Sequence, residues 1–540
     1  MPKPNSFLTM ERNHSLPQEI ESPEMIGDPS GNRSLRLNYM SNFIGSCWAA
    51  LLGILFVPVY LEYIGVEAYG IIGFFTSLQA LFFLLDLGLS PAFNREVARY
   101  SAASGYANKL RKLTRTLALV NLAVAVVIGV LLCVLAPIFA NYWVNASVLS
   151  VSDVSQSFVI MAIASALQFP IGFYLSGLAG MQRQVASNVV LIVFGTLRSV
   201  GAVFVLAFFS PTLQAFLIWQ VWITFLQMIA TAVLFYSGLP SANEKVSFDS
   251  QLLKSVWRFA AGNTGIGLTA LLLTQTDKIV LSRLVPLETF GYYSLAAMIS
   301  MTALVMMTSS VSKVAFPEFS TLVARGDDAG LRRAFHKNAQ FVTVLVAPAA
   351  VILAVFSREI LLVWTRDPVV AEQGHVLLTL IAIGTGVNCL AWIPYYAQLA
   401  HGWTRLTFFT NVFAVVGLLL LLLFLVPRYG AVGGAAGIVV VHVLYLLIYV
   451  TLMTRRILNG EFVNWFVSDL LLPVAAVVIG VFVGAVFASG STGTLQILAG
   501  VGLTTFAAYV AAALTSRFVR DRLIGAAPNW FGRKNADVEQ

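Results

Sequence analysis

Apolar stretches of about 20 residues recur along almost the whole chain after residue 39, and a helix of that length crosses a bilayer. They are far longer than the roughly ten residues of a barrel strand and lack strand-type alternation. Because backbone polar groups in lipid must be paired within a helix or a closed barrel, these stretches must be helices. Only 11% of the 540 residues are charged, whereas a soluble domain is usually about a quarter charged. We therefore predict an all-α polytopic membrane protein.

About fourteen spans are predicted, and they divide the chain into successive segments. A polar N-terminal arm without the apolar core of a signal peptide comes first. Two six-helix lobes follow, and two further helices and a polar tail end the chain. The segments are the arm (1–39), the N-lobe (40–237), a cytoplasmic linker (238–257), the C-lobe (258–454), spans 13 and 14 (469–515) and the tail (516–540). The spans are 40–64, 68–91, 115–138, 156–180, 187–209, 213–237, 258–282, 289–312, 338–357, 374–397, 405–427, 432–454, 469–489 and 494–515.

Basic residues indicate the direction of these spans, because short loops rich in Lys and Arg stay on the cytoplasmic side. Most of the 33 Lys and Arg residues fall in alternate segments, beginning with the N-terminal arm. The intervening loops hold only Arg283, Arg358, Arg366 and Arg428. We therefore expect both termini to be cytoplasmic. The net charge of +8 reflects topology on this interpretation, so nucleic acid is not an expected partner.

Two loops that enter even-numbered spans resemble each other, which indicates an internal repeat. IGVEAYGIIGFFTSL (64–78) resembles VPLETFGYYSLAAMI (285–299). The offset is constant and spans six helices, so both copies start on the same side of the membrane. A parallel repeat of this kind predicts two lobes related by an axis along the membrane normal, with a central path between them. The matched pairs are Glu67 with Glu288, Tyr69 with Phe290 and Gly70 with Gly291.

Four segments carry motifs at the level of a family: YIGVEAYGIIGFFTSLQALFFLLDLGLSPAFNREVAR (63–99), AFLIWQ (215–220), QTDKIVLSRLVPLETFGYYSLA (275–296) and VPRYGAVGGAAGIV (426–439). They resemble the polysaccharide transporter family, the lipid-linked oligosaccharide flippases that include the O-antigen translocases, within the multidrug/oligosaccharidyl-lipid/polysaccharide exporter superfamily. The resemblance implies a multi-pass protein of the bacterial inner membrane. It would translocate a polyprenyl-pyrophosphate-linked oligosaccharide for O-antigen, capsule or exopolysaccharide biosynthesis. Its implied partners are the polysaccharide polymerase and glycosyltransferases of the same pathway.

Four charged residues lie inside predicted spans and away from the span ends; a charge near the bilayer centre costs roughly 3 kcal/mol or more and usually faces a cavity or a partner. Arg198 is near the middle of span 5, Asp86 is in the inner part of span 2, and Asp277 and Lys278 are in the outer third of span 7. The repeat counterparts of Asp277 and Lys278 in span 1 are apolar, so the scaffold does not require this pair. We predict that Arg198 and Lys278 offer successive cationic contacts to the pyrophosphate in a cationic central cavity, by alternating access.

A structural role is the alternative for each of these charges. Lys278 would pair with Asp277 or extend to the outer interface. Asp86 would cap a helix or pair with Arg95 or Arg99. Arg198 would form a buried pair with an acid such as Asp86.

Uncharged polar residues inside the spans are weaker candidates. Each would either bind sugar hydroxyls in a water-lined cavity or link neighbouring helices. Pro58, inside span 1, would be a hinge if it bends that helix beside the cavity, and otherwise a static kink. The cavity candidates are Asn42, Gln79, Asn263, Thr274, Gln275 and Asn388.

No catalytic motif stands out, and the phosphate-binding GxxxxGK[ST] loop, CxxC and HExxH are absent from the sequence. We expect no enzyme and no cofactor, with energy drawn from a proton or sodium gradient or the membrane potential. The outer loops are too short for a membrane-embedded glycosyltransferase. The alternative function is an ion-coupled exporter of small amphipathic drugs, in which Asp86 or Asp277 would be the cation or proton site. Two basic residues inside the membrane favour an anionic substrate.

Overall fold

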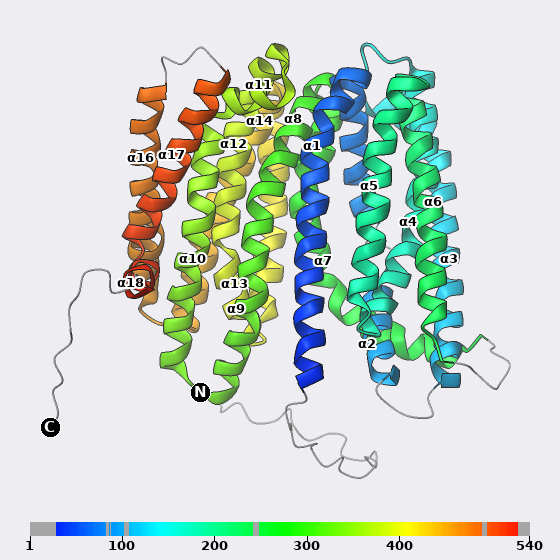
Figure 1. Ribbon diagram of the computed structural model, residues 1–540, viewed down its shortest axis with the longest axis horizontal. Coiled ribbons are helices and arrows are strands. Elements are labelled where there is room, and N and C mark those ends of the chain that lie inside the picture. Colours follow the sequence, from blue (N-terminus) through cyan, green and yellow to red (C-terminus); the bar gives the residue numbers. More distant parts are fainter. Residues whose placement is uncertain are drawn as a thin grey trace, which may run out of the picture.

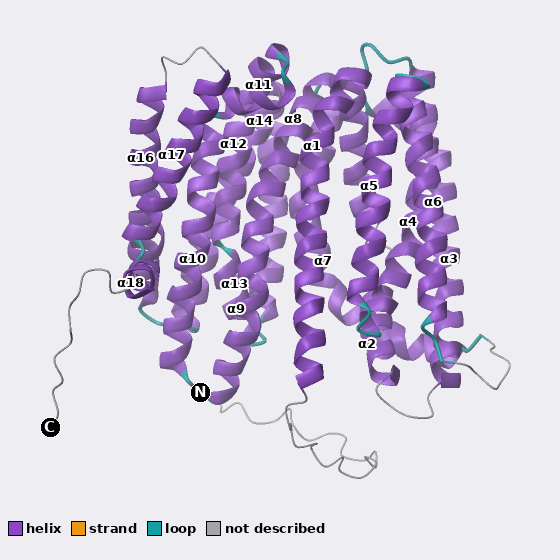
Figure 2. Ribbon diagram, in the orientation of Figure 1, coloured by secondary structure: helices purple, strands orange, loops and turns teal. Residues whose placement is uncertain are grey.

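A computed structural model describes residues 29–82, 86, 88–101, 107–240, 248–488 and 494–526. This part of the chain is almost entirely helical and contains no β-strand beyond an isolated bridge between Asn145 and Pro286. Eleven of its helical segments are long and apolar enough to cross a membrane. The helices run side by side in one bundle (Figure 2). The prediction of an all-α polytopic fold is therefore confirmed.

The N-lobe and the C-lobe follow each other along the chain, and two helices complete the bundle. The helices of the N-lobe are α1 (Pro29–Phe82), α2 (Leu89–Ser101), α3 (Ala107–Ile138), the π-helix η2 (Phe139–Trp143), α4 (Val151–Gly180), α5 (Gln184–Phe208) and α6 (Leu213–Ser237). Those of the C-lobe are α7 (Ser250–Leu284), α8 (Leu287–Ser300), the π-helix η3 (Met301–Val305), α9 (Met306–Arg325), α10 (Asp328–Val355), α11 (Ser357–Thr365), α12 (Pro368–Leu390), α13 (Trp392–Ala400) and α14 (Thr404–Arg456). The C-terminal helices are α15 (Glu461–Asn464), the π-helix η4 (Trp465–Leu471), α16 (Leu472–Ala488), α17 (Thr494–Thr515) and α18 (Arg517–Ala526).

Two of the eleven long segments contain a sharp break at a glycine. Gly65 in α1 has φ 78° and Gly430 in α14 has φ 58°, a left-handed conformation that glycine adopts without steric cost. Each break separates two spans that run in opposite directions. When each of the two broken segments is counted as two spans and α7 is added, the spans follow one another in the predicted order.

Some boundaries differ from the prediction. The first helix begins at Pro29, inside the predicted arm, and α7 begins at Ser250, inside the predicted linker. The predicted tail contains α18, and the second span ends at Phe82 rather than near residue 91. Composition alone misses these ends because polar helical turns continue beyond the apolar core of a span.

The two lobes meet closely where the repeated loops enter their helices. A Cβ atom at Gly70 would lie 2.4 Å from the carbonyl oxygen of Leu287, and one at Gly291 would lie 2.4 Å from that of Val66. The repeat counterparts Gly70 and Gly291 thus face each other, as residues beside a two-fold axis do. Only glycine lets α1 and α8 approach this closely.

Hydrogen bonds join the lobes at the same end of the bundle. The Leu287 amide donates to the Asn145 carbonyl oxygen at 2.9 Å, and the Asn145 side chain donates to the Arg283 carbonyl oxygen at 3.0 Å. Trp143 donates to the hydroxyl of Ser282 at 3.1 Å. We name these contacts, with Gly70 and Gly291, the outer seam, after the side of the membrane on which the basic loops predict this end to lie. The opposite end, where α1 begins and α18 ends, is the inner end (Figure 1).

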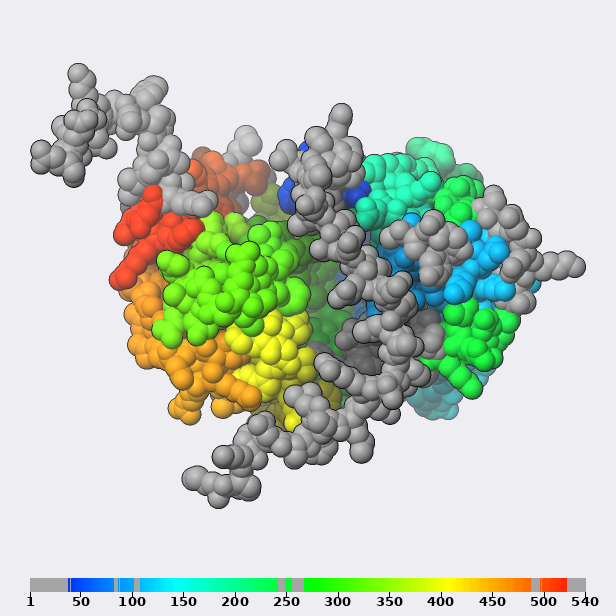
Figure 3. Space-filling view, turned by 90° about the horizontal axis from the view of Figure 1, so that it is seen from below, coloured from blue at the N-terminus to red at the C-terminus, as the bar shows by residue number. Residues whose placement is uncertain are grey.

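At the inner end the start of α7 reaches the N-lobe, where the amide of Asp249 donates to the hydroxyl of Thr116 at 3.0 Å. Seen from this side, a depression separates the N-lobe, coloured mostly blue and cyan, from the C-lobe (Figure 3). The largest cluster of the apolar core joins the two lobes, since it includes Phe74 of the N-lobe and Phe290 of the C-lobe. A second cluster around Phe93, Leu113 and Phe235 is built from N-lobe helices, and Leu252 and Leu253 of α7 pack against it. The bundle is therefore closed at the outer seam and hollowed between the lobes at the inner end.

Candidate functional site

The C-lobe holds a cavity of about 220 Å³ between α7, α12, α13 and α14. Its wall combines aromatic rings with amide and hydroxyl groups, and no charged residue lies among the described residues that line it. Thr274 and Asn388, two of the predicted cavity residues, are brought together here from different helices. We name it the C-lobe cavity. Its polar and aromatic residues include Thr274, Asn388, Trp392, Tyr395, Tyr396 and Asn411.

Three aromatic residues of α13 form one side of this cavity. Trp392, Tyr395 and Tyr396 are spaced so that a helix places them on one face. Tyr396 packs against both, with ring centroids 6.4 Å from Trp392 and 5.1 Å from Tyr395. The Trp392 indole donates to the Asn388 side-chain oxygen at 3.3 Å across the break between α12 and α13. These contacts fix the orientation of the rings.

The opposite side is held by hydrogen bonds from α14. Tyr445 donates to the Asn411 side-chain oxygen at 3.0 Å, and Asn411 donates to the hydroxyl of Thr269 at 3.3 Å. By contrast, the hydroxyls of Tyr395 and Tyr396 bond to no other residue that the structure describes. The cavity therefore combines a hydrogen-bonded frame with two tyrosine hydroxyls that have no partner among the described residues.

Lys278 lies one helical turn beyond Thr274 on the same face of α7. Its ammonium group contacts the sulfur of Met301 at 3.8 Å and forms no ion pair with a described carboxylate. Asp277 points away, because consecutive helical residues differ in direction by about 100°. It is buried and accepts a hydrogen bond from the hydroxyl of Tyr293. No direct ion pair joins Lys278 to Asp277, although the two neighbouring charges interact electrostatically.

Arg198 lies between α5 and α6 within the N-lobe. Its guanidinium donates to the Gln227 side-chain oxygen at 2.7 Å and to the Thr224 hydroxyl at 3.3 Å. Its Nε is buried and unpartnered among the described atoms. Both acceptors are neutral, so the alternative pairing with Asp86 is not the arrangement observed, and the positive charge is not neutralised by these contacts.

Asp86 lies in the break between α1 and α2 rather than inside a span. It accepts hydrogen bonds from the amide of Ser90 at 3.0 Å and from its hydroxyl at 2.9 Å. A carboxylate that accepts from the first turn of a helix stabilises that helix end. Asp86 therefore caps α2, the structural alternative for this residue.

The uncharged candidates of the N-lobe link helices within that lobe. Asn42 donates to Gln184 at 2.7 Å and accepts from Asn188 at 2.6 Å. Gln79 donates to Gln168 at 2.7 Å. Their roles in substrate binding remain predictions.

The remaining candidates lie on α7 and α1. Gln275 is buried on α7, and the side chain of Asn263 lies outside the described residues. Pro58 is inside α1, but the backbone leaves helical geometry at Gly65. A hinge at Pro58 also remains a prediction, and Gly65 is the site of the observed break.

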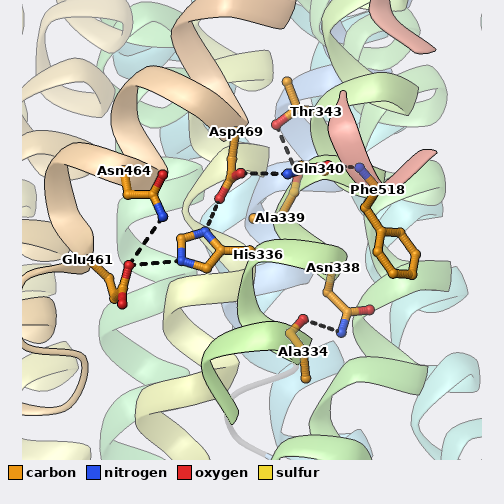
Figure 4. A network of polar contacts seen from close by, with 10 residues as sticks. All are labelled: Ala334, His336, Asn338, Ala339, Gln340, Thr343, Glu461, Asn464, Asp469 and Phe518. Atoms are coloured by element: carbon orange, nitrogen blue, oxygen red, sulfur yellow. Dashed lines mark hydrogen bonds and ion pairs between the residues drawn. The ribbon is translucent and has the colours of Figure 1, made fainter. Parts of the chain in front are cut away.

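One polar network was not predicted from the sequence. His336 of α10 contacts the carboxylate of Asp469 through one ring nitrogen and that of Glu461 through the other, the latter at 3.2 Å (Figure 4). Gln340 donates to Asp469 at 2.8 Å and accepts from the Phe518 amide at 2.9 Å. The network fastens η4 and α18 to α10, so it positions the C-terminal helices. Only a fold that brings residues more than 100 positions apart together reveals it.

Comparisons with known sequences identify the family. The model of the family described as polysaccharide biosynthesis protein matches residues 35–323, more than half of the chain. A Shigella flexneri protein named as an O-antigen transporter is 21% identical over 430 residues, which are 78% of this chain and 98% of that protein. The succinoglycan biosynthesis transport protein ExoT of Rhizobium meliloti (strain 1021) is 26% identical over 210 residues, which are 38% of this chain and 40% of that protein.

Solved structures share the fold. The lipid II flippase MurJ in an inward closed conformation matches with a TM-score of 0.67 and 15% identity, covering 90% of this chain and 100% of that one. An inward-facing MATE family multidrug resistance transporter of the MOP superfamily matches with a TM-score of 0.63 and 14% identity, covering 76% and 94%. The chain belongs to the polysaccharide biosynthesis protein family and has the fold of the MOP superfamily of membrane transporters, not that of an enzyme.

Proposed function

We propose that the chain is a flippase that moves a polyprenyl-pyrophosphate-linked oligosaccharide across the bacterial plasma membrane for surface polysaccharide biosynthesis. The family match and the transport proteins of O-antigen and succinoglycan support this substrate class. The sugar and the pyrophosphate cannot cross hydrocarbon unaided, because polar groups stripped of water without partners cost several kcal/mol each. The depression between the two lobes would serve as the polar path, while the polyprenyl tail stays in lipid.

The chemistry of the C-lobe cavity carries this proposal. Aromatic rings pack against the apolar face of a sugar ring, and amide and hydroxyl groups bond to its hydroxyls. Trp392 and Tyr396 supply the rings, and Asn388 and Tyr395 supply polar groups. The described lining carries no charge, which favours a neutral saccharide over a cationic drug.

Lys278 and Arg198 are the proposed cationic contacts for the pyrophosphate. Lys278 stands one turn beyond the C-lobe cavity and has no carboxylate partner among the described residues. Arg198 is held by neutral acceptors, which orient its guanidinium without cancelling its charge. A guanidinium binds phosphate in a bidentate manner, and an ammonium binds it as a point charge.

Transport by alternating access would open the outer seam while the inner ends of the lobes close. The substrate then leaves on the side opposite both termini, and the distribution of basic loops supports a cytoplasmic position for the termini. We propose coupling to a proton or sodium gradient or to the membrane potential. We further propose that the product passes to a polysaccharide polymerase.

The test is a deletion strain of the host complemented with wild type or variants, with the membrane level of each protein measured. We expect the deletion to accumulate lipid-linked oligosaccharide on the inner leaflet and to lose surface polysaccharide. The double variant Asn388→Ala/Tyr396→Ala should not restore export. Phe413→Ala, which removes a ring that is 74% exposed on α14, should restore it. Normal surface polysaccharide in the deletion strain would refute the proposal, and loss of drug efflux there would support the exporter instead.

A further inference from the structure

A second concave site lies on the side of the N-lobe, away from the C-lobe. It has a volume of about 720 Å³ and is formed by α3, α4 and α6 alone. These helices stand at the edge of the bundle farthest from α16 and α17 (Figure 1). Several of its apolar side chains are exposed, including Leu122 at 51% and Val233 at 63%. We name it the N-lobe groove, and it faces the lipid rather than the depression between the lobes.

The inner end of the groove is basic. Arg115 lies at its rim, is exposed, and forms no hydrogen bond or ion pair with the rest of the described chain. Arg111, one turn nearer the inner end, donates to the carbonyl oxygen of Pro240 at 2.6 Å beyond the end of α6. No acidic residue is among the described residues that line the groove. An anion at this rim would meet the guanidinium of Arg115, with that of Arg111 one turn away, and no carboxylate among the described lining residues.

A buried amide lies deeper in the same groove. Asn121 is 2% exposed and lines the groove, yet it forms no hydrogen bond with any described residue. The amide of Asn121 therefore has a free donor at the wall of the groove, and a ligand atom that accepts its hydrogen bond would satisfy it. Asn121 follows Arg115 by six residues, which is about 9 Å along the axis of α3. The groove thus presents a cation at the membrane surface and a hydrogen-bond donor about 9 Å deeper.

We propose that the N-lobe groove binds an anionic diacyl glycerophospholipid of the inner leaflet. Its phosphate lies at Arg115 and Arg111, and an ester carbonyl accepts from the amide of Asn121. One acyl chain packs along Phe173 and Ile229 toward the centre of the bilayer. Basic sites between membrane helices on the cytoplasmic side are suited to anionic headgroups. A polyprenyl phosphate matches the charge and the apolar wall but has no ester carbonyl for Asn121.

The experiment is native mass spectrometry of the delipidated full-length protein titrated with defined lipids. The probes are ester-linked phosphatidylglycerol, its ether-linked analogue, phosphatidylcholine and a polyprenyl phosphate. We expect ester-linked phosphatidylglycerol to bind most tightly. Arg115→Gln should weaken it about fivefold, as expected for one basic residue near the membrane surface. Arg325→Gln, which removes an exposed charge from the inner end of α9, is the matched control and should change nothing.

The proposed hydrogen bond of Asn121 is tested by changing its donor in the protein and its acceptor in the lipid. Asn121→Leu should weaken the ester-linked lipid but leave the ether-linked lipid unchanged, and the two lipids should then bind equally. The ether-linked lipid should bind wild type more weakly than the ester-linked one, a comparison that does not depend on the folding of any variant. Equal binding of the two lipids to wild type, or tighter binding of polyprenyl phosphate, would overturn the proposal. These results are independent of glycan export, so they separate the lipid site from the proposed flippase function.

Discussion

The outer seam predicts that a single methyl group at Gly70 opens the bundle. In Gly70→Ala the new Cβ would lie 2.4 Å from the carbonyl oxygen of Leu287, whereas the closest favourable carbon–oxygen contacts are about 3.3 Å. The seam must therefore widen by about 1 Å. Both colliding groups lie on helices, so no flexible side chain can move aside. We expect the closed seam to be destabilised relative to a conformation in which the lobes separate at the outer end.

Overpacking by one carbon typically costs about 1–3 kcal/mol. If the open conformation has no such collision, this cost shifts the ratio of closed to open molecules by about 5-fold to 150-fold. A shift of this size is visible by a method that reports populations. Because export requires both conformations, we also expect Gly70→Ala to export less polysaccharide than wild type.

The assay is double electron–electron resonance with spin labels at the outer ends of both lobes. Tyr142 and Val369 are suitable positions because they are 73% and 56% exposed. The native cysteines, Cys47, Cys133 and Cys389, are first replaced. Gly70→Ala should add a population with a longer distance between the labels.

Gly417→Ala is the matched control, since an added Cβ on α14 would have no atom within 4 Å. It should leave the distance distribution as in wild type. Gly291→Ala should reproduce the effect of Gly70→Ala, because its Cβ meets the carbonyl oxygen of Val66 at 2.4 Å. Identical distributions for Gly70→Ala and Gly417→Ala would refute the assignment of this contact as the outer closure.

Substitutions at Lys278, Asp469 and Asp86, with Glu372→Ala as a control, separate binding from stability. Lys278→Gln should lower polysaccharide export about tenfold or more at a normal membrane level, because it removes a charge-assisted contact. Lys278→Arg keeps the charge and should retain most of the export. Equal export by the two variants would exclude a phosphate contact. Asp469→Ala should destabilise the purified protein by about 3 kcal/mol in thermal unfolding, because it leaves His336 and Gln340 without a buried acceptor. Glu372→Ala, in an exposed pair, should cost at most about 1 kcal/mol. Asp86→Ala should lose about 1 kcal/mol of capping energy but keep export, and failure to export at a normal membrane level would restore Asp86 as a site residue.

The order of the spans and their approximate number could be read from the sequence because each span has to bury about 20 apolar residues in lipid. The repeat was equally readable, and its counterparts Gly70 and Gly291 lie in contact. Helix ends were less accurate, as at Ser250 and Phe82, because polar turns extend or interrupt helices without a hydropathy signal.

Side-chain partners could not be read in the same way. The adjacent charges Asp277 and Lys278 suggested a pair, but the helix turns Asp277 toward Tyr293 and Lys278 toward Met301. The aromatic face of α13 had a sequence signal, since Trp392, Tyr395 and Tyr396 share the spacing of one helix face. This spacing alone does not indicate a ligand cavity, because aromatic residues at helical spacing also fill ordinary cores.

The residues that follow the repeat and those that break it have different places in the molecule. Gly70 and Gly291 follow it, and they meet at the closed end, where two related lobes must make the same contact. Lys278 breaks it and stands beside the C-lobe cavity, on one lobe only. A lipid-linked sugar has no two-fold symmetry, so its contacts need not be duplicated, whereas a closure between two related lobes uses both copies. Substitution of residues that follow the repeat should therefore change the balance between conformations. Substitution of residues that break the repeat should change which substrate is carried.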